Sequence, residues 1–415
     1  MRAKLLLRRS RHTFGTSLSG ATCGSSLKLR QSLDSTGASK MIDSTLTLPS
    51  LALWYQRGMT HPVKAKPPTV ELHVNLWRRI GRDDEDINYL DIGVRVIEQR
   101  DVGALNLYVP FKPDQCVFED LAHLLRRNEI ASAVFNELLE VQPTEDGAGT
   151  FFINQRGSHM LSVHEINRLC DIEFVTEFPD QAPPGFVIKI LPSFCAKFQS
   201  PGEHYIRFRL SLKREAAEIF SSDVSNEDGW ILSSTTTSEI TEIRVNEVRS
   251  IPSSVLRLAE MHNWLSPQLS AIHYFLVRDI SFDLIASHSS FRKIRRMEPV
   301  WDAYLGPNFP PGSARNMLIY HWRKVAEPGD LGDFVTLAKF RRSKTNLAFY
   351  IVLVIALGSL GSGLHATVSQ VLKRATWEGT WVALLLLPSG WEVFVATVLL
   401  GLFAWWLAHI AKKRP

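Results

Sequence analysis

The stretch VELHVNLWRRI, Val70–Ile80, decides the fold class of this chain. Apolar and polar side chains alternate along it. One side carries Val70, Leu72, Val74 and Leu76, and the other carries Glu71, His73 and Asn75. Because successive side chains of a strand point to opposite faces of a sheet, this pattern predicts a half-buried β-strand.

Similar stretches recur after it at short intervals, and each is bounded by glycine, proline or aspartate. They are residues 88–98, 104–111, 150–155, 160–166, 170–178, 186–191, 204–212, 230–248, 272–282 and 317–325. They do not alternate regularly with helices, which argues against a doubly wound parallel sheet. We therefore expect an α+β or mainly β body, arranged as a sandwich or as two stacked sandwiches.

A helical insertion is predicted near residues 114–141. Asp114 is placed to cap a first helix, and Asn128 is placed to cap a second. Apolar side chains follow at helical spacing in both, namely Phe118, Leu121, Leu125, Ile130, Val134 and Leu138. Shorter helices are expected at 213–220 and 252–261.

The C-terminal region predicts a transmembrane hairpin. Residues 347–368 and 393–410 contain no Asp, Glu, Lys or Arg. As helices they would span roughly 33 Å and 27 Å, close to a hydrocarbon core of about 30 Å. Backbone polar groups in lipid must bond to each other, so both runs are expected to be helices. The alternative is a buried helical pair in a large soluble protein.

Basic residues around the hairpin predict its orientation. They precede the first span at Lys339, Arg341, Arg342 and Lys344 and follow the second at Lys412, Lys413 and Arg414, whereas the connecting loop has only Lys373 and Arg374. The excess of positive charge places both termini and the body on the cytoplasmic side. We expect a multi-pass protein of the bacterial inner membrane.

Residues 1–69 are predicted to be a basic, Ser/Thr-rich segment and linker, disordered at least to residue 40. The first acidic residue is Asp34. Three interpretations stay open: a mitochondrial transit peptide, which would imply the mitochondrial inner membrane, low-complexity sequence, or translation that starts at Met41. Three regions are thus predicted. They are the N-terminal segment and linker at 1–69, a β-rich cytosolic body at 70–337 with a possible sub-boundary near 201, and the juxtamembrane basic segment with the transmembrane hairpin at 338–415.

Composition and motifs exclude several function classes. The 415 residues have a net charge of +5, and the basic residues form no long tract, so nucleic acid is not a predicted partner. Four scattered cysteines give neither metal-ligand spacing nor a disulfide framework. GxSxG, P-loop and HExxH motifs are absent. His164-Glu165 and His262 are isolated, so we predict no catalytic residue, no metal site and no cofactor.

The basic run within SSFRKIRRME predicts a site for an anionic ligand or lipid headgroup. Phe291, Ile294 and Met297 recur every third residue, which favours an amphipathic helix with a basic face. The basic residues are Arg292, Lys293, Arg295 and Arg296, and Lys339, Arg341, Arg342 and Lys344 form a second group beside the membrane. Such groups bind anionic lipid or a phosphate-bearing ligand, unless they are only solvated charges.

Small residues within the spans predict self-association. Gly358, Ser362 and Ala366 lie four apart in the first span, as do Ala404 and Ala408 in the second. Close packing between helices in lipid depends on such faces. One face can pair the two helices of a hairpin, and the other is then left for a neighbouring chain, which predicts a homo-oligomer.

A body without catalytic motifs on a terminal two-span hairpin resembles, in arrangement alone, membrane effectors of bacterial stress and antiviral systems. The resemblance implies a sensor–effector that detects a phosphate-bearing small ligand or a protein partner and perturbs the lipid bilayer. Two alternatives stay open. One is a membrane-tethered interaction or scaffold module, and the other is a membrane-bound enzyme whose site is assembled from scattered residues.

Overall fold

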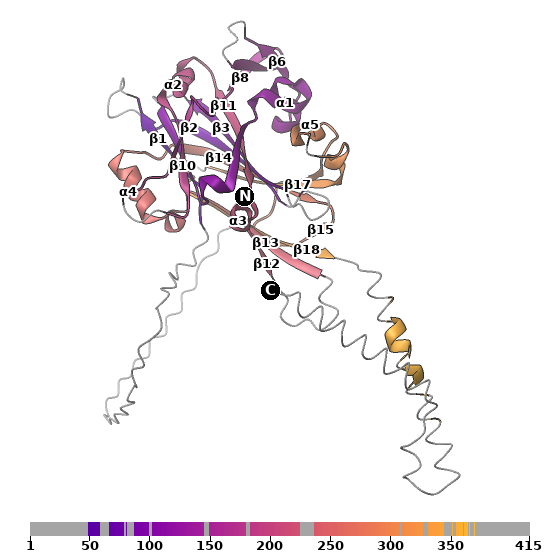
Figure 1. Ribbon diagram of the computed structural model, residues 1–415. Helices are drawn as coiled ribbons and strands as arrows, with labels where there is room; N and C mark the ends of the chain where they lie inside the picture. Colours follow the sequence, from indigo (N-terminus) through magenta and orange to yellow (C-terminus); the bar gives the residue numbers. More distant parts are fainter. Residues whose placement is uncertain are drawn as a thin grey trace, which may run out of the picture. The chain divides into compact units, whose positions relative to one another are not determined.

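Strands account for most of the regular structure, and only short helices accompany them (Figure 1). The computed structural model describes residues 49–58, 66–78, 80, 87–98, 102–144, 149–179, 183–224, 236–307, 309–326 and 331–343, and the helical positions 351, 354–359, 361–363, 365 and 369. All of these residues belong to one compact unit, Thr47–Pro415. The expectation of a mainly β body is confirmed.

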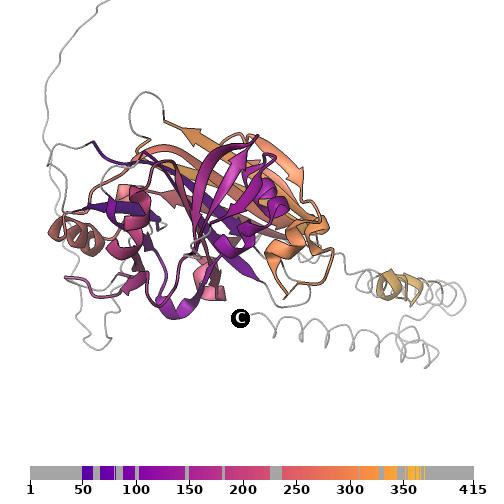
Figure 2. The same ribbon diagram turned by 90° about the horizontal axis from the view of Figure 1, so that it is seen from above.

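The largest sheet has ten strands within the described part of the chain. Across it lie β16 (Lys293–Arg296), β17 (Met317–Val325), β14 (Gln268–Asp279), β2 (Thr69–Trp77), β3 (Asn88–Glu98), β11 (His204–Leu212), β8 (Ser158–His164), β7 (Thr150–Gln155) and β6 (Glu140–Pro143), and β5 (Cys116–Asp120) also pairs with β11. Strands β2 and β14 pair in parallel, as do β8 and β11. As a result, strands from the first part of the chain (purple in Figure 2) lie beside strands from its last part (orange).

Two smaller sheets share a hydrophobic core with the large one. The first contains β1 (Ala52–Arg57), β4 (Val102–Val109), β10 (Phe186–Ile190) and β9 (Ile172–Val175), and the second contains β12 (Ser221–Val224), β13 (Thr236–Val245), β18 (Phe334–Ser343) and β15 (Phe282–Ser287). One buried cluster contains residues from all three sheets, for example Leu72, Leu107 and Phe340. The sandwich arrangement stays a prediction.

The opposite side of the large sheet carries polar side chains, and we call it the polar face. Alternation along β2 directs Val70 and Leu72 into the shared core and leaves Glu71 and His73 on the polar face. Helices α1 (Asn128–Phe135) and α5 (Trp301–Leu305) pack on this face through a second cluster, which includes Trp77. The polar face is therefore partly covered, and any site on it is sheltered from solvent.

The other helices are short. They are α2 (Pro192–Cys195), α3 (Arg214–Glu218), α4 (Ser253–Met261), and 3-10 turns at Pro113–Gln115, Ala122–Arg126, Ala196–Gln199, Val248–Ser250 and Ser313–Asn316. Helix α4 packs on β1 through Leu258 and Trp54. The predicted helices near 213–220 and 252–261 are confirmed.

The helical insertion is only partly correct. Strand β5 occupies part of the first predicted helix, because it pairs with β11 and Phe118 stacks on Phe208 with ring centroids 5.0 Å apart. The second helix exists as α1, but Arg127 is its N-terminal cap. The Asn128 Oδ1 instead accepts a hydrogen bond from the Val141 amide at 2.9 Å.

The predicted amphipathic helix in SSFRKIRRME is wrong, because these residues form β16. The strand pairs antiparallel with β17, from Lys293 opposite His321 to Arg296 opposite Leu318. The apolar residues at three-residue spacing do not share one face, because Ile294 is 42% exposed whereas Met297 is buried in the second cluster. Tertiary pairing therefore overrides the local pattern.

The described strands extend beyond the predicted body at 70–337, since β1 pairs with β4 before residue 70 and β18 continues to Ser343. Strands β8 and β11 lie on either side of residue 201 and pair with each other. The domain limits stay a prediction. Residues 1–48, Lys344, Ala366 and the second predicted span with Ala404 and Ala408 lie outside the described residues. Among the residues described, no helix is long and apolar enough to cross a membrane.

Candidate functional site

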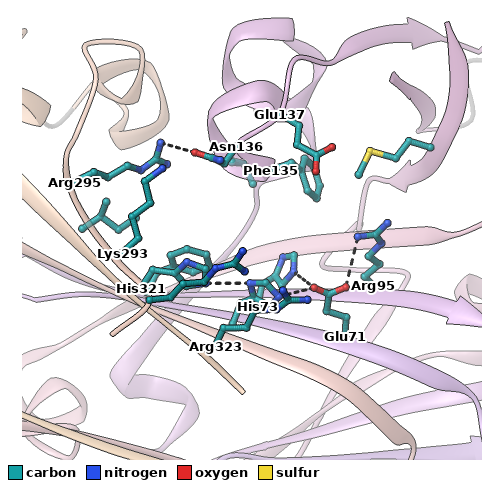
Figure 3. Close-up of a pocket in the computed structure, with 16 residues that line it drawn as sticks. Glu71, His73, Arg95, Phe135, Asn136, Glu137, Lys293, Arg295, His321 and Arg323 are labelled. Atoms are coloured by element: carbon teal, nitrogen blue, oxygen red, sulfur yellow. Dashed lines mark hydrogen bonds and ion pairs between the residues drawn. The ribbon is translucent and has the colours of Figure 1, made fainter. Parts of the chain in front are cut away.

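A cavity of about 420 Å³ opens on the polar face, between the large sheet and the C-terminal end of α1 (Figure 3). Strands β2, β3, β14, β16 and β17 all contribute to its lining. The ionisable lining residues are Glu71, His73, Arg95, Glu137, His273, Arg292, Lys293, Arg295, His321 and Arg323. Imidazole and basic side chains thus dominate this cavity.

The floor of the cavity is a cluster of Glu71, His73 and His273. Glu71 and His73 are two residues apart on β2 and share a face, and the parallel pairing places His273 of β14 beside His73. The Glu71 Oε1 lies 3.4 Å from His73 Nε2 and 2.7 Å from His273 Nε2. Three potential ligand atoms therefore converge on one point.

A hydroxyl group fixes the His73 ring from behind. The His73 Nδ1 lies 3.1 Å from the Tyr205 hydroxyl, which also accepts a hydrogen bond from Arg207 Nη1 at 3.0 Å. Gly93 of β3 makes this contact possible, because a Cβ at that position would overlap the Tyr205 hydroxyl. The absence of a side chain at Gly93 is thus a condition for the site.

Aromatic stacking fixes His321 beside the cluster. The His321 Nε2 lies 3.1 Å from His273 Nδ1, and its ring stacks on Phe275 with centroids 4.2 Å apart and planes 14° apart. These flat rings come from the adjacent strands β14 and β17. They give the cavity an apolar, planar wall next to its polar floor.

Burial shifts the ionisation of the floor residues. It lowers the pKa of His73 to about 4, partly offset by Glu71, and together with His273 and Arg292 it lowers the pKa of His321 to about 3. Burial opposes ionisation of Glu71, but the adjacent His273 and His73 imidazoles hold the pKa of that carboxyl well below its usual range. At neutral pH the floor therefore offers a carboxylate beside uncharged His73 and His321 imidazoles.

The rim of the cavity carries basic side chains without carboxylate partners. Arg292, Lys293 and Arg323 are exposed, and the described part of the chain places no Asp or Glu in an ion pair with them. Arg95 is different, since it contacts Glu71 and Glu203. The cavity lining contains five Lys or Arg residues and only two carboxylates, so it attracts anions.

Arg295 has a structural role at the rim. Its guanidinium donates to Asn136 Oδ1 at 3.1 Å (Figure 3). It also donates to the Ala133 carbonyl at 3.3 Å and pairs with Glu298 at 3.1 Å. These contacts join β16 to the end of α1 across the cavity mouth. Arg295 therefore fixes the end of α1 against β16.

A buried ionic network supports the sheet behind the site. Asp91 is fully buried and accepts hydrogen bonds from Trp77 Nε1 at 2.7 Å, the Tyr304 hydroxyl at 2.8 Å and Arg209 Nε at 2.7 Å. The same Tyr304 hydroxyl accepts from Arg207 Nε at 2.7 Å. Through Arg207 the network reaches the Tyr205 hydroxyl and so the ring of His73.

The structure brings together only part of the predicted anion site. Arg292, Lys293 and Arg295 line the cavity, whereas Arg296 donates to the Arg315 carbonyl outside it. Lys339, Arg341 and Arg342 lie on β18 of another sheet, and Lys344 is outside the described residues. The isolated histidines lie elsewhere: His164 contacts His204, and His262 stacks on Trp264.

A second cavity, of about 540 Å³, is lined by Trp54, Glu247 and Asp333 among others. Its lining includes no Lys, Arg or His among the residues described. It therefore lacks the concentration of donors and potential ligands that marks the first cavity. The sequence pattern indicated Arg292, Lys293 and Arg295 of the first cavity, but neither Arg323 nor the floor residues.

Comparisons with known proteins identify no relative. No family model matches the chain, and no curated protein matches it. An M1 zinc metallopeptidase from Deinococcus radiodurans matches in structure at 11% identity over 70% of this chain and 43% of that one, with a TM-score of 0.23. The Fcho1 mu homology domain of Danio rerio with a bound Eps15 peptide matches at 9% identity over 71% and 81%, with a TM-score of 0.12. This chain spans less than half the length of the peptidase, and neither score supports an inference.

Proposed function

We propose that the protein is a ligand sensor whose body binds a small phosphate-bearing molecule in the cavity on the polar face. The observation that carries the proposal is the rim of Arg292, Lys293 and Arg323, three cations without a carboxylate partner among the described residues. A phosphate group would supply the missing negative charge, with charge-assisted hydrogen bonds that are about twice as strong as neutral ones.

Two further features support a small ligand over an extended one. The volume of about 420 Å³ lies within the range of small-molecule sites. The stacked rings of Phe275 and His321 offer a flat surface on which a planar group of the ligand can lie. A phosphate joined to a planar ring, as in a nucleotide, fits both features.

Binding of pyrophosphate and of adenosine monophosphate to the full chain, measured by calorimetry, tests the proposal. We expect saturable binding that Arg323→Gln weakens about tenfold or more, because one charge-assisted hydrogen bond contributes roughly 1.5–3 kcal/mol. Lys324→Gln is the matched control, since Lys324 is adjacent but contacts Asp333. Absence of binding, or equal weakening by both variants, would contradict the proposal.

The C-terminal segment is proposed to act on a membrane when the body binds its ligand. Support comes from the uncharged runs 347–368 and 393–410 and from Ile351, Val354, Ile355 and Leu357, which are exposed large apolar side chains in the described part of the first run. Dye leakage from cells that express the chain with or without residues 344–415 tests this step. Leakage independent of the segment would leave a tethered module or an enzyme as the better explanation.

A further inference from the structure

We propose that Glu71, His73 and His273 form a binding site for a divalent transition metal, with Zn²⁺ as the reference ion. One ligand atom from each residue lies within 4.8 Å of the other two. Ligand atoms about 2.0–2.1 Å from a tetrahedral metal are roughly 3.4 Å apart, so small side-chain shifts suffice to enclose an ion. Two histidines and one carboxylate are a ligand set that zinc and related metals favour over magnesium or calcium.

The second polar atom of each ligand is held by a neighbour, as in established metal sites. The Nδ1 of His73 meets the Tyr205 hydroxyl, the Nδ1 of His273 meets His321 Nε2, and the Glu71 Oε2 lies 3.5 Å from Arg95 Nη1. These contacts turn His73 Nε2, His273 Nε2 and Glu71 Oε1 toward one another. Metal binding requires that His73 carry its proton on Nδ1 and donate it to Tyr205.

The His273 nitrogen provides a second, independent observation. Its Nε2 is buried and lies 2.7 Å from Glu71 Oε1, yet it makes no hydrogen bond of acceptable direction with any described group. A hydrogen-bonded carboxylate–imidazole pair would leave no such orphan atom. A cation shared by the two atoms would satisfy both in place of the missing hydrogen bond, and their separation would then widen from 2.7 Å to roughly 3.4 Å.

Three protein ligands leave a fourth position open, and it faces the cavity and its basic rim. In catalytic and ligand-binding zinc sites that position holds water or a substrate oxygen. The rim cations repel a dication, whereas a bound phosphate attracts it, so metal and phosphate should strengthen each other's binding reciprocally. The metal site itself does not depend on the proposed ligand, because the metal alone is a sufficient probe.

Metal binding by the full chain tests the site directly. Zn²⁺ has no visible spectrum because its d shell is full, so Co²⁺ is the spectroscopic probe and elemental analysis after dialysis gives the Zn²⁺ content. We expect one equivalent of Zn²⁺ and visible Co²⁺ bands at one equivalent. Glu71→Gln, His73→Gln and His273→Gln should each lower affinity at least 100-fold, while Glu137→Gln, at the same cavity, should leave it unchanged.

His321→Gln probes the supporting contact, since it removes the partner of His273 Nδ1 and keeps all three ligands. Loss of such a partner typically lowers metal affinity 10–100-fold. Less than a fifth of an equivalent of Zn²⁺ in the parent would overturn the proposal, as would a His273→Gln variant that binds like the parent. If a ligand variant does not fold, the Co²⁺ spectrum of the parent decides. Metal uptake without phosphate binding would refute only the proposed function.

Discussion

Replacing Asp91 by asparagine should destabilise the body more than any exposed charge change. Asp91 is the carboxylate that neutralises Arg209, whose guanidinium is 2% exposed and donates to both carboxylate oxygens, at 2.7 and 3.2 Å. The substitution keeps the size of the side chain but leaves a buried cation unpaired. It also replaces one carboxylate oxygen by an amide nitrogen, so that either Arg209 Nε or both Trp77 Nε1 and the Tyr304 hydroxyl lose their acceptor.

Removing one partner of a buried ion pair costs about 3–5 kcal/mol, a large part of a total stability of roughly 5–15 kcal/mol. Urea unfolding of the full chain, followed by tryptophan fluorescence, measures the loss. Glu218→Gln is the control, because it breaks an ion pair with Arg214 in which the side chains are 51% and 87% exposed, and such pairs contribute less than about 1 kcal/mol. A similar small loss in both variants would refute the interpretation that Asp91 holds a buried charge.

Three further predictions concern pH, packing and association. Burial, with His204 and Lys197, lowers the pKa of His164 to about 3, so the folded state keeps this residue neutral while the unfolded chain binds a proton below about pH 6.5. His164 alone should therefore lower the free energy of unfolding by about 2 kcal/mol between pH 7 and pH 5, and His73 and His321 should add to this loss, because their pKa values are lowered as well. In urea unfolding, His164→Gln should reduce the pH dependence, with the exposed His159→Gln as the control. Gly93→Ala should lower the free energy of unfolding by about 1–3 kcal/mol and weaken Zn²⁺ binding, because the added Cβ displaces Tyr205 from His73. Unchanged unfolding curves and metal titration curves would contradict this prediction. Gly358→Leu and Ser362→Leu should weaken self-association, which crosslinking in membranes measures. Neither variant should prevent insertion, since Leu is favourable in lipid and a Cβ at Gly358 meets no atom of the described residues within 4 Å. Oligomers like those of the parent would show that Gly358 and Ser362 serve only packing within one chain.

Local sequence patterns predicted some strands closely and missed others, such as β1, β5 and β18. The expected limits of β7, β11 and β17 agree with the structure residue for residue, because period-two alternation is a direct consequence of strand geometry. The pattern failed at β16, where the spacing of Phe291, Ile294 and Met297 suits a helix but pairing with β17 decides the backbone. Pairing partners are a property of the whole fold, which a local window does not contain.

The floor of the site shows where sequence information ends. The alternation in β2 placed Glu71 and His73 on one face, and two ligand-type side chains at that spacing are a usable signal. His273 gave no signal, because its proximity depends on parallel pairing between strands 200 positions apart. Arg292 and Lys293 of the predicted anion site lie at the rim, Arg323 was not predicted, and anion binding stays a prediction.

The parallel pairing of β2 with β14 also has a consequence for synthesis of the chain. At about 5–20 residues per second, a ribosome needs roughly 10–40 s after Glu71 and His73 emerge to add His273. During that time β2 can pair with β3, but its other edge stays open, and closing so long a loop is intrinsically slow. A nascent or truncated chain that ends before β14 therefore has an unpaired strand edge and no complete site. The proposed metal site can therefore form only after β14, which carries His273, has been made.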